Sequence, residues 1–205
     1  MPPITRTLVY ANLAVFAAQL LSADRLLPDF ALWPVGSFDE PSLGRRVGFE
    51  PWQLVTSAFL HGGVAHLLLN MFALYMFGSD VERALGARRY AVLYIAAVLT
   101  AGIVQLAVVS GMAGDGRPVP TVGASGGVFG VLLAFGMLFP RRRVLLLIPP
   151  IPMPAWLLVF GYGILELING VFGTMSGVAH FAHLGGMLGA FVVLYRWRRF
   201  FHTRY

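Results

Sequence analysis

The chain has 205 residues, of which 58% are hydrophobic and only 12% charged, a composition that excludes an ordinary soluble globular domain. The absence of cysteine excludes disulfides and thiolate metal sites. The net charge is +6, but the arginines gather at the ends of apolar runs, where they indicate membrane topology rather than binding of nucleic acid.

The apolar residues fall into six segments, which predict an all-α membrane protein. The first segment, about 7–27, follows Arg6 and has two interpretations, a retained membrane helix or a cleaved signal peptide. The other segments cover about 54–77, 90–110, 125–139, 153–173 and 178–195. We therefore expect one membrane domain over residues 1–205, a bundle of six transmembrane helices with a short, central fourth helix.

A long loop, about 28–51, separates the first two segments. It mixes Phe30, Trp33 and Phe38 with acids and prolines, and Trp52 follows it. Two interpretations remain open: a loop whose aromatic side chains lie among the lipid headgroups, or an ordinary external loop.

The arginines predict the orientation of the segments. If the loops alternate between the two sides of the membrane, eleven arginines lie on the side of both termini and four on the other. Six of the nine acidic residues accompany those four. Because arginine-rich loops face the cytoplasm, both termini are expected there.

Segment four gives the clearest sign of a functional site. Ser125 stands among glycines at its start, and Pro140 followed by three arginines marks its end. Arg141 follows Ser125 by sixteen positions, which span about 24 Å of helix, less than the roughly 30 Å of a hydrocarbon core. Ser125 is therefore expected below the external membrane surface, where it needs protein or a water-filled cavity around it.

Two other segments carry polar side chains to a similar depth. At 1.5 Å per residue, His66 and Asn70 lie about 21 and 15 Å above the cytoplasmic end of segment two. By the same measure His183 and His180 lie about 20 and 24 Å above the cytoplasmic end of segment six. Polar groups at this depth face the bundle interior or a cavity, so the sequence predicts a shared polar site.

The residue types in this site suit acyl transfer. Serine becomes a nucleophile when a histidine takes its proton, and depth alone does not separate His180 from His183. His66 and Asn70 are four residues apart and share one helix face. Together with the backbone N–H of Ser125, at a helix N-terminus, they can stabilise an oxyanion.

Some of these polar residues also have purely structural interpretations. Ser125 could be a packing contact in a ladder of small residues that includes Gly126 and Gly130. Glu166, the only acid inside a segment, is expected to form a local polar pair with Asn169 or to line a cavity. No carboxylate is well placed to orient a histidine, so we expect a Ser–His dyad rather than a triad. The H-E-x-x-H arrangement of a zinc protease is absent, and no metal or cofactor is expected.

From about Trp52 to Arg196 the chain resembles the rhomboid intramembrane serine proteases. Residues 123–126 are similar to the family's G-x-S-G nucleophile motif. Residues 182–186 are similar to its A-H-x-x-G motif, which selects His183 over His180 as the base. Residues 66–70 are similar to its H-x-x-x-N motif, which implies an oxyanion role for His66 and Asn70.

A fourth similarity and two departures complete the comparison of motifs. Gly78, Glu82 and Gly86 resemble a G-x-x-x-E-x-x-x-G signature, with an expected structural role. Gln53 follows Trp52 where many members have arginine, so no role of that arginine is inherited. Phe129 stands where a tyrosine often stacks on the histidine, which keeps the aromatic ring and loses the hydroxyl.

The resemblance implies a rhomboid-like fold and hydrolysis of peptide bonds in or next to transmembrane segments of membrane proteins. His183 would take the proton of Ser125, and the residues expected to support this site are Gly123, Gly126, Phe129 and Gly186. The expected partners are transmembrane-helix substrates and the lipid bilayer, with no nucleic acid. The absence of lysine suggests a bacterial inner membrane.

The resemblance also suggests that substrates enter past segment five and the loop 174–177. The glycines of this region, Gly170, Gly173 and Gly177, would let that gate move. Two other classes of function remain: a non-catalytic membrane binder or chaperone, and a channel or transporter. A channel needs polar residues that continue to the cytoplasmic side, and segment four offers none beyond Gly130.

Overall fold

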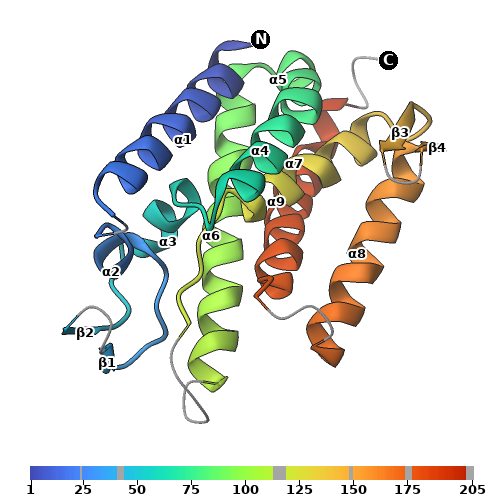
Figure 1. Cartoon of the computed structure of the whole chain (residues 1–205). Coiled ribbons are helices and arrows are strands. Elements are labelled where there is room, and N and C mark those ends of the chain that lie inside the picture. The colour runs from blue at the N-terminus through green and yellow to red at the C-terminus, as the bar shows by residue number, and fades with distance from the viewer. Residues whose placement is uncertain (24, 41–43, 113–118, 148–149, 174–176, 202–205) are drawn as a thin grey trace.

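The computed structural model describes residues 1–23, 25–40, 44–112, 119–147, 150–173 and 177–201, and it is mostly helical (Figure 1). The longer helices are α1 (Pro3–Leu21), α4 (Val64–Ala73), α5 (Ser79–Leu85), α6 (Ala87–Met112), α7 (Ser125–Leu138), α8 (Ala155–Phe172) and α9 (His180–Phe201). The short elements are α2 (Leu27–Phe30), α3 (Gln53–Thr56) and the strands β1 (Phe38–Glu40), β2 (Arg45–Val47), β3 (Arg143–Leu147) and β4 (Pro150–Pro154).

Four helical stretches of the described residues are long and apolar enough to cross a membrane. They are Pro3–Leu21, Val64–Leu85, Ala87–Met112 and Ala155–Phe172, and α7 is a shorter apolar helix. Many large apolar side chains on these helices are exposed, among them Leu69, Ile103 and Phe160. A lipid environment accounts for such exposure, so the chain is an integral membrane protein.

The second long helix begins later than the expected range of 54–77. Residues 53–59 form α3 and a 3-10 turn, and the helix starts at Val64 after a break at Gly62 and Gly63. The backbone of Gly63 has a φ of 154°, which residues with a side chain rarely adopt, so the helix cannot run through it. A π-helical turn, Leu74–Gly78, then joins α4 to α5.

Helix α7 packs against α4, α5, α6, α8 and α9. Small residues permit this close packing: Gly130 lies against Ala97 of α6 and against Gly186 and Ala190 of α9. A Cβ on Gly186 would overlap the carbonyl group of Gly126. The backbones of α7 and α9 therefore touch at the level of the first turn of α7.

Residues 31–34 of the loop before α3 are buried in the molecule. Leu32 and Thr121 exchange two backbone hydrogen bonds of 3.0 and 2.9 Å, which tie the loop to the segment that precedes Ser125. Trp33 is only 2% exposed, so the interpretation that places the aromatic side chains of the loop among the lipid headgroups does not hold for it, whereas Trp52 is 51% exposed. The loop therefore supports the segment that leads into α7.

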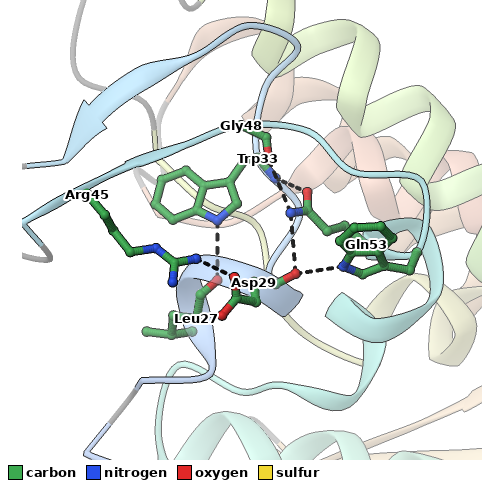
Figure 2. Close-up of polar contacts among 7 residues, drawn as sticks. Leu27, Asp29, Trp33, Arg45, Gly48 and Gln53 are labelled. Atoms are coloured by element: carbon green, nitrogen blue, oxygen red, sulfur yellow. Dashed lines mark hydrogen bonds and ion pairs between the residues drawn. The ribbon is translucent and has the colours of Figure 1, made fainter.

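Gln53 holds this loop together (Figure 2). Its amide nitrogen donates to the carbonyls of Gly48 at 3.1 Å and Asp29 at 3.5 Å, and its amide oxygen accepts the N–H of Trp33 at 3.2 Å. Trp52 donates its indole N–H to the same Asp29 carbonyl at 2.9 Å. Gln53 is 1% exposed, so these bonds form in a site closed to water.

Glu82 caps the start of α1. Its carboxylate accepts the backbone N–H groups of Ile4 and Thr5 at 2.9 and 2.7 Å and the Thr5 hydroxyl at 2.7 Å. These N–H groups belong to the first turn of α1, which has no intrahelical acceptors for them. The role expected for Glu82 is thus structural, as predicted.

Strands β3 and β4 form an antiparallel hairpin that the sequence does not predict. Prolines occur in strands only at sheet edges, and both strands of a two-stranded sheet are edges. Arg142, next to the hairpin, lies 2.7 Å from Asp80 of α5. In Figure 1 the N-terminus, α5, this hairpin and the end of α9 lie at one end of the molecule, and α2, β1 and β2 at the other.

Candidate active site

Ser125 and His183 lie within hydrogen-bond distance. The Oγ of Ser125 is 2.8 Å from Nε2 of His183, across the close packing of α7 and α9. Ser125 is the first residue of α7, and His183 lies in the first turn of α9. The structure thus brings together the two side chains that the sequence predicts as a pair, at a distance that suits transfer of a proton from serine to histidine.

An aromatic ring holds the plane of this histidine. The ring of Phe129 stacks on the ring of His183, with centroids 4.1 Å apart and planes 6° from parallel. Phe129 itself meets the ring of Tyr162 edge-on, at 6.2 Å. The stacking position expected for Phe129 is thus occupied by its ring, without a hydroxyl group.

His66 lies over Gly123, next to Ser125. A Cβ on Gly123 would come within 2.7 Å of the His66 ring and 3.6 Å of the serine Oγ, and its φ of 131° also favours glycine. The N–H of Gly62 points at Nδ1 of His66 from 3.4 Å. If Nδ1 accepts this bond, the proton of a neutral His66 is on Nε2, the nitrogen nearer Gly123.

Asn70 is buried one turn below His66, and its amide donates to the carbonyl of His66 at 2.9 Å. This bond lies within α4 and engages one of its two amide protons. The shared helix face expected for these two residues is present, while the Asn70 amide is directed to its own helix.

The carboxylate of Glu166 lies close to both histidines of α9. Oε2 of Glu166, on α8, is 2.6 Å from Nδ1 of His180 and 2.9 Å from Nδ1 of His183. The expectation that no carboxylate is placed to orient the histidine is therefore wrong. The signal was present in the sequence, since an acid inside a membrane segment is a functional candidate whose partner should be sought.

The distances in this cluster fit hydrogen bonding better than a metal site. The three side chains bring one ligand atom each within 4.8 Å of one another. Ligands around tetrahedral zinc stand about 3.3 Å apart, given bonds of about 2.05 Å to nitrogen. The separations of 2.6 and 2.9 Å are shorter, as hydrogen bonds and ion pairs require.

Residues 48–200 match the Rhomboid domain family. This chain is a rhomboid. It is 33% identical to "Rhomboid protein 1, mitochondrial" of Saccharomyces cerevisiae over 96% of this chain and 56% of the relative. It is 32% identical to "Rhomboid protease GluP" of Bacillus subtilis over 69% of this chain and 25% of the relative. A third relative is "Rhomboid protease GlpG" of Klebsiella pneumoniae, 30% identical over 50% of this chain and 34% of the relative.

This rhomboid spans about half or less of the length of these three relatives. Two of these relatives are bacterial and one is mitochondrial, so they do not decide whether this chain lies in a bacterial or a mitochondrial membrane. The matched range includes Ser125, His183 and Glu166.

A small cavity borders Ser125 on the side of α6. Its polar lining consists of Ser57, Gln105, Thr121 and Ser125. Gln105 donates to the Thr121 hydroxyl at 3.2 Å, and its amide oxygen is buried with no hydrogen-bond partner among the described residues. The cavity thus offers polar groups that suit a water molecule.

The expected gate is described only in part, because residues 174–176 lie outside the described ranges. Gly173 ends α8 with a φ of 64°, and Gly177 has a φ of 88°. Gly170 faces α9 closely: a Cβ there would lie 3.2 Å from His180 and Phe181. Gly170 therefore permits close packing of α8 on α9 in this structure.

Proposed function

We propose that this rhomboid is a serine endopeptidase that cleaves peptide bonds in or next to transmembrane segments of membrane proteins. The observation that carries the proposal is the 2.8 Å contact between Ser125 Oγ and His183 Nε2 at the N-terminus of α7. A hydroxyl is a weak nucleophile, and a neighbouring imidazole corrects this by taking its proton. The names of the relatives from Bacillus subtilis and Klebsiella pneumoniae support a protease.

The acylation step begins with attack of Ser125 Oγ on the carbonyl carbon of the substrate. As the Oγ–C bond forms, the serine proton moves to Nε2 of His183 and the carbonyl electron pair moves to oxygen. Collapse of this tetrahedral intermediate breaks the C–N bond. The departing amine takes the proton from Nε2, which leaves an acyl-enzyme on Ser125 and a neutral His183.

Two groups near Ser125 are suited to hold the oxyanion. The backbone N–H of Ser125 lies at the N-terminus of α7, where it has no acceptor within the helix. The positive end of the helix dipole strengthens it as a donor to an oxyanion. Nε2–H of His66 is the second donor, because the Gly62 contact favours the proton on that nitrogen. Asn70 becomes a third donor if its free amide proton turns toward the oxyanion.

Deacylation needs a water molecule next to Ser125. The cavity with Ser57, Gln105 and Thr121 in its lining is a source of that water, because it borders Ser125 itself. The water gives a proton to His183 Nε2 while its oxygen attacks the ester carbon. Ser125 Oγ then leaves with that proton, which restores the resting enzyme and releases an acid.

We further propose that one domain spans 1–205 as a six-helix bundle, in which α7 and α9 also lie in the membrane. The arginine distribution supports cytoplasmic termini. The placement of the N-terminus and the end of α9 at one end of the molecule agrees with it (Figure 1). A bacterial plasma membrane is the proposed location, supported by the absence of lysine.

The direct test uses purified protein in liposomes with a model single-span substrate. Wild type is compared with Ser125→Ala, His183→Ala and, as a matched control, Ser79→Ala, a buried serine of α5 outside the site. We expect cleavage by wild type and Ser79→Ala and none by the other two. Cleavage by Ser125→Ala would contradict the proposal. If wild type cleaves nothing, and wild type and Ser125→Ala bind the single-span substrate equally well, the result would favour a membrane binder.

A further inference from the structure

Two histidines of α9 converge on one carboxylate oxygen of α8. Oε2 of Glu166 makes a hydrogen bond of 2.6 Å with Nδ1 of His180 and lies 2.9 Å from Nδ1 of His183. All three side chains are buried. A buried carboxylate is costly unless donors or positive charge compensate it, and these two imidazoles are placed to do so.

The contact with Ser125 fixes where the proton of His183 lies. If Nε2 accepts the serine hydroxyl, the proton of the neutral ring is on Nδ1. This Nδ1–H is buried, and among the described residues it has no aligned hydrogen-bond acceptor. The atom 2.9 Å away is Oε2 of Glu166, so the distance already suits a hydrogen bond and only the alignment of the two groups has to change.

We propose that Glu166 is a positioning residue of the catalytic group. It holds His183 in the Nδ1–H tautomer and stabilises the positive charge that His183 acquires when it takes the serine proton. His180 holds the carboxylate in place through its 2.6 Å hydrogen bond to the same oxygen. The inference rests on the proposed peptidase function and replaces the expected dyad by a Ser–His–Glu arrangement.

The physical reason is the change of charge during the reaction. In the resting state a neutral ring meets a carboxylate, and the contact is not aligned. In the transition state the ring is a cation, and a hydrogen bond between opposite charges is shorter and stronger. Catalytic contacts that are imperfect at rest commonly tighten in this way. His66 of α4 cannot stabilise the positive charge on His183 in place of Glu166, because an imidazole carries no negative charge.

The test compares Glu166→Gln and Glu166→Asp with wild type in the liposome assay. Glutamine keeps the shape and removes the charge, whereas aspartate keeps the charge and withdraws the oxygen by one methylene group. The matched control is Glu82→Gln, which changes a buried carboxylate at the cap of α1, away from Ser125. For each variant kcat, KM and the melting temperature are measured, and kcat is taken per folded molecule.

We expect Glu166→Gln to lower kcat at least about tenfold with KM within about twofold, because the lost interaction belongs to the transition state. Glu166→Asp should recover part of the loss, and Glu82→Gln should keep wild-type kcat at a lower melting temperature. Wild-type kcat in Glu166→Gln, or no recovery by aspartate, would overturn the role of Glu166. So would inactivation of wild type by a metal chelator, which would assign the cluster to a metal ion.

Failure of the wider proposal would look different. An active Ser125→Ala variant would refute the peptidase mechanism itself. An inactive Ser125→Ala variant beside a fully active Glu166→Gln variant would leave the dyad and remove only Glu166. If Glu166→Gln does not fold, Glu166→Met takes its place, because it also removes the charge at similar length, and a wild-type kcat per folded molecule in that variant would overturn the inference.

Discussion

The ring of Phe129 lies flat on the ring of His183, 4.1 Å between centroids and 6° from parallel. Phe129 is one helical turn after Ser125, so the helix that presents the serine also presents the surface on which the histidine rests. The contact restricts rotation of the imidazole, whose Nε2 must face Ser125 and whose Nδ1 must face Glu166.

Removing this ring should slow catalysis without unfolding the protein. A stacked aromatic pair contributes about 0.5–1.5 kcal/mol beyond its buried area, so Phe129→Ala should lower kcat by about 3- to 10-fold. Phe129→Tyr keeps the ring and should retain most of the activity. A Phe129→Ala variant with wild-type kcat would show that the stacking does not orient His183.

The contact of α7 with α9 predicts a strong effect at Gly186. A methyl group there would overlap the carbonyl of Gly126, and backbone atoms cannot move aside as a flexible side chain can. Gly186→Ala should destabilise the protein by about 3 kcal/mol and abolish cleavage by separating Ser125 from His183. The measurement is thermal unfolding in detergent together with the liposome assay.

Gly161→Ala is the matched control for that experiment. Gly161 lies in α8, and a Cβ there would meet no atom within 4 Å. Alanine has a higher helix propensity by about 1 kcal/mol, so this variant should be as stable as wild type or slightly more stable. Equal loss of stability in both variants would argue that packing at Gly186 is not special.

Loss of the Glu82 carboxylate should destabilise the folded protein without affecting catalysis. Glu82→Ala leaves two backbone N–H groups and the Thr5 hydroxyl without their acceptor, in a site where Glu82 is 2% exposed. Unfolding free energy should fall by about 3 kcal/mol. The kcat per folded molecule should stay at the wild-type value, and a changed kcat would show that α1 affects the site.

Loss of the Gln53 side chain should loosen the loop before α3. Gln53→Ala removes both its donor and its acceptor, which join Asp29, Gly48 and Trp33. The loop should open more often, and trypsin should cut faster after the exposed Arg45 and Arg46. Unchanged rates of cleavage at these arginines would mean that other contacts hold the loop.

Much of the site could be predicted because it depends on local patterns. Glycine and proline mark the start and end of α7, and depth along each helix follows from a fixed rise per residue. The identity of the base could not be derived from depth, because His180 and His183 differ by less than one turn. Only the motif similarity selected His183, and the structure places that ring beside Ser125.

Other features depend on packing that a sequence does not encode locally. The position of Glu166 depends on the rotation of α8 and its distance from α9, and neither follows from the period of apolar residues. Trp33 is buried because Leu32 pairs with Thr121, a contact between residues far apart in the chain. The start of α4 was a different kind of error, since the break at Gly62 and Gly63 was visible in the sequence.

The most direct measurement of the central claim is covalent labelling of the nucleophile. Detergent-solubilised protein is treated with a fluorophosphonate, and the modified residue is located by mass spectrometry in wild type and in His183→Ala. Activation of Ser125 by His183 predicts one adduct, on Ser125 of the wild type, and none on His183→Ala that is still folded. An adduct on another residue, or equal labelling of Ser125 in both proteins, would contradict it.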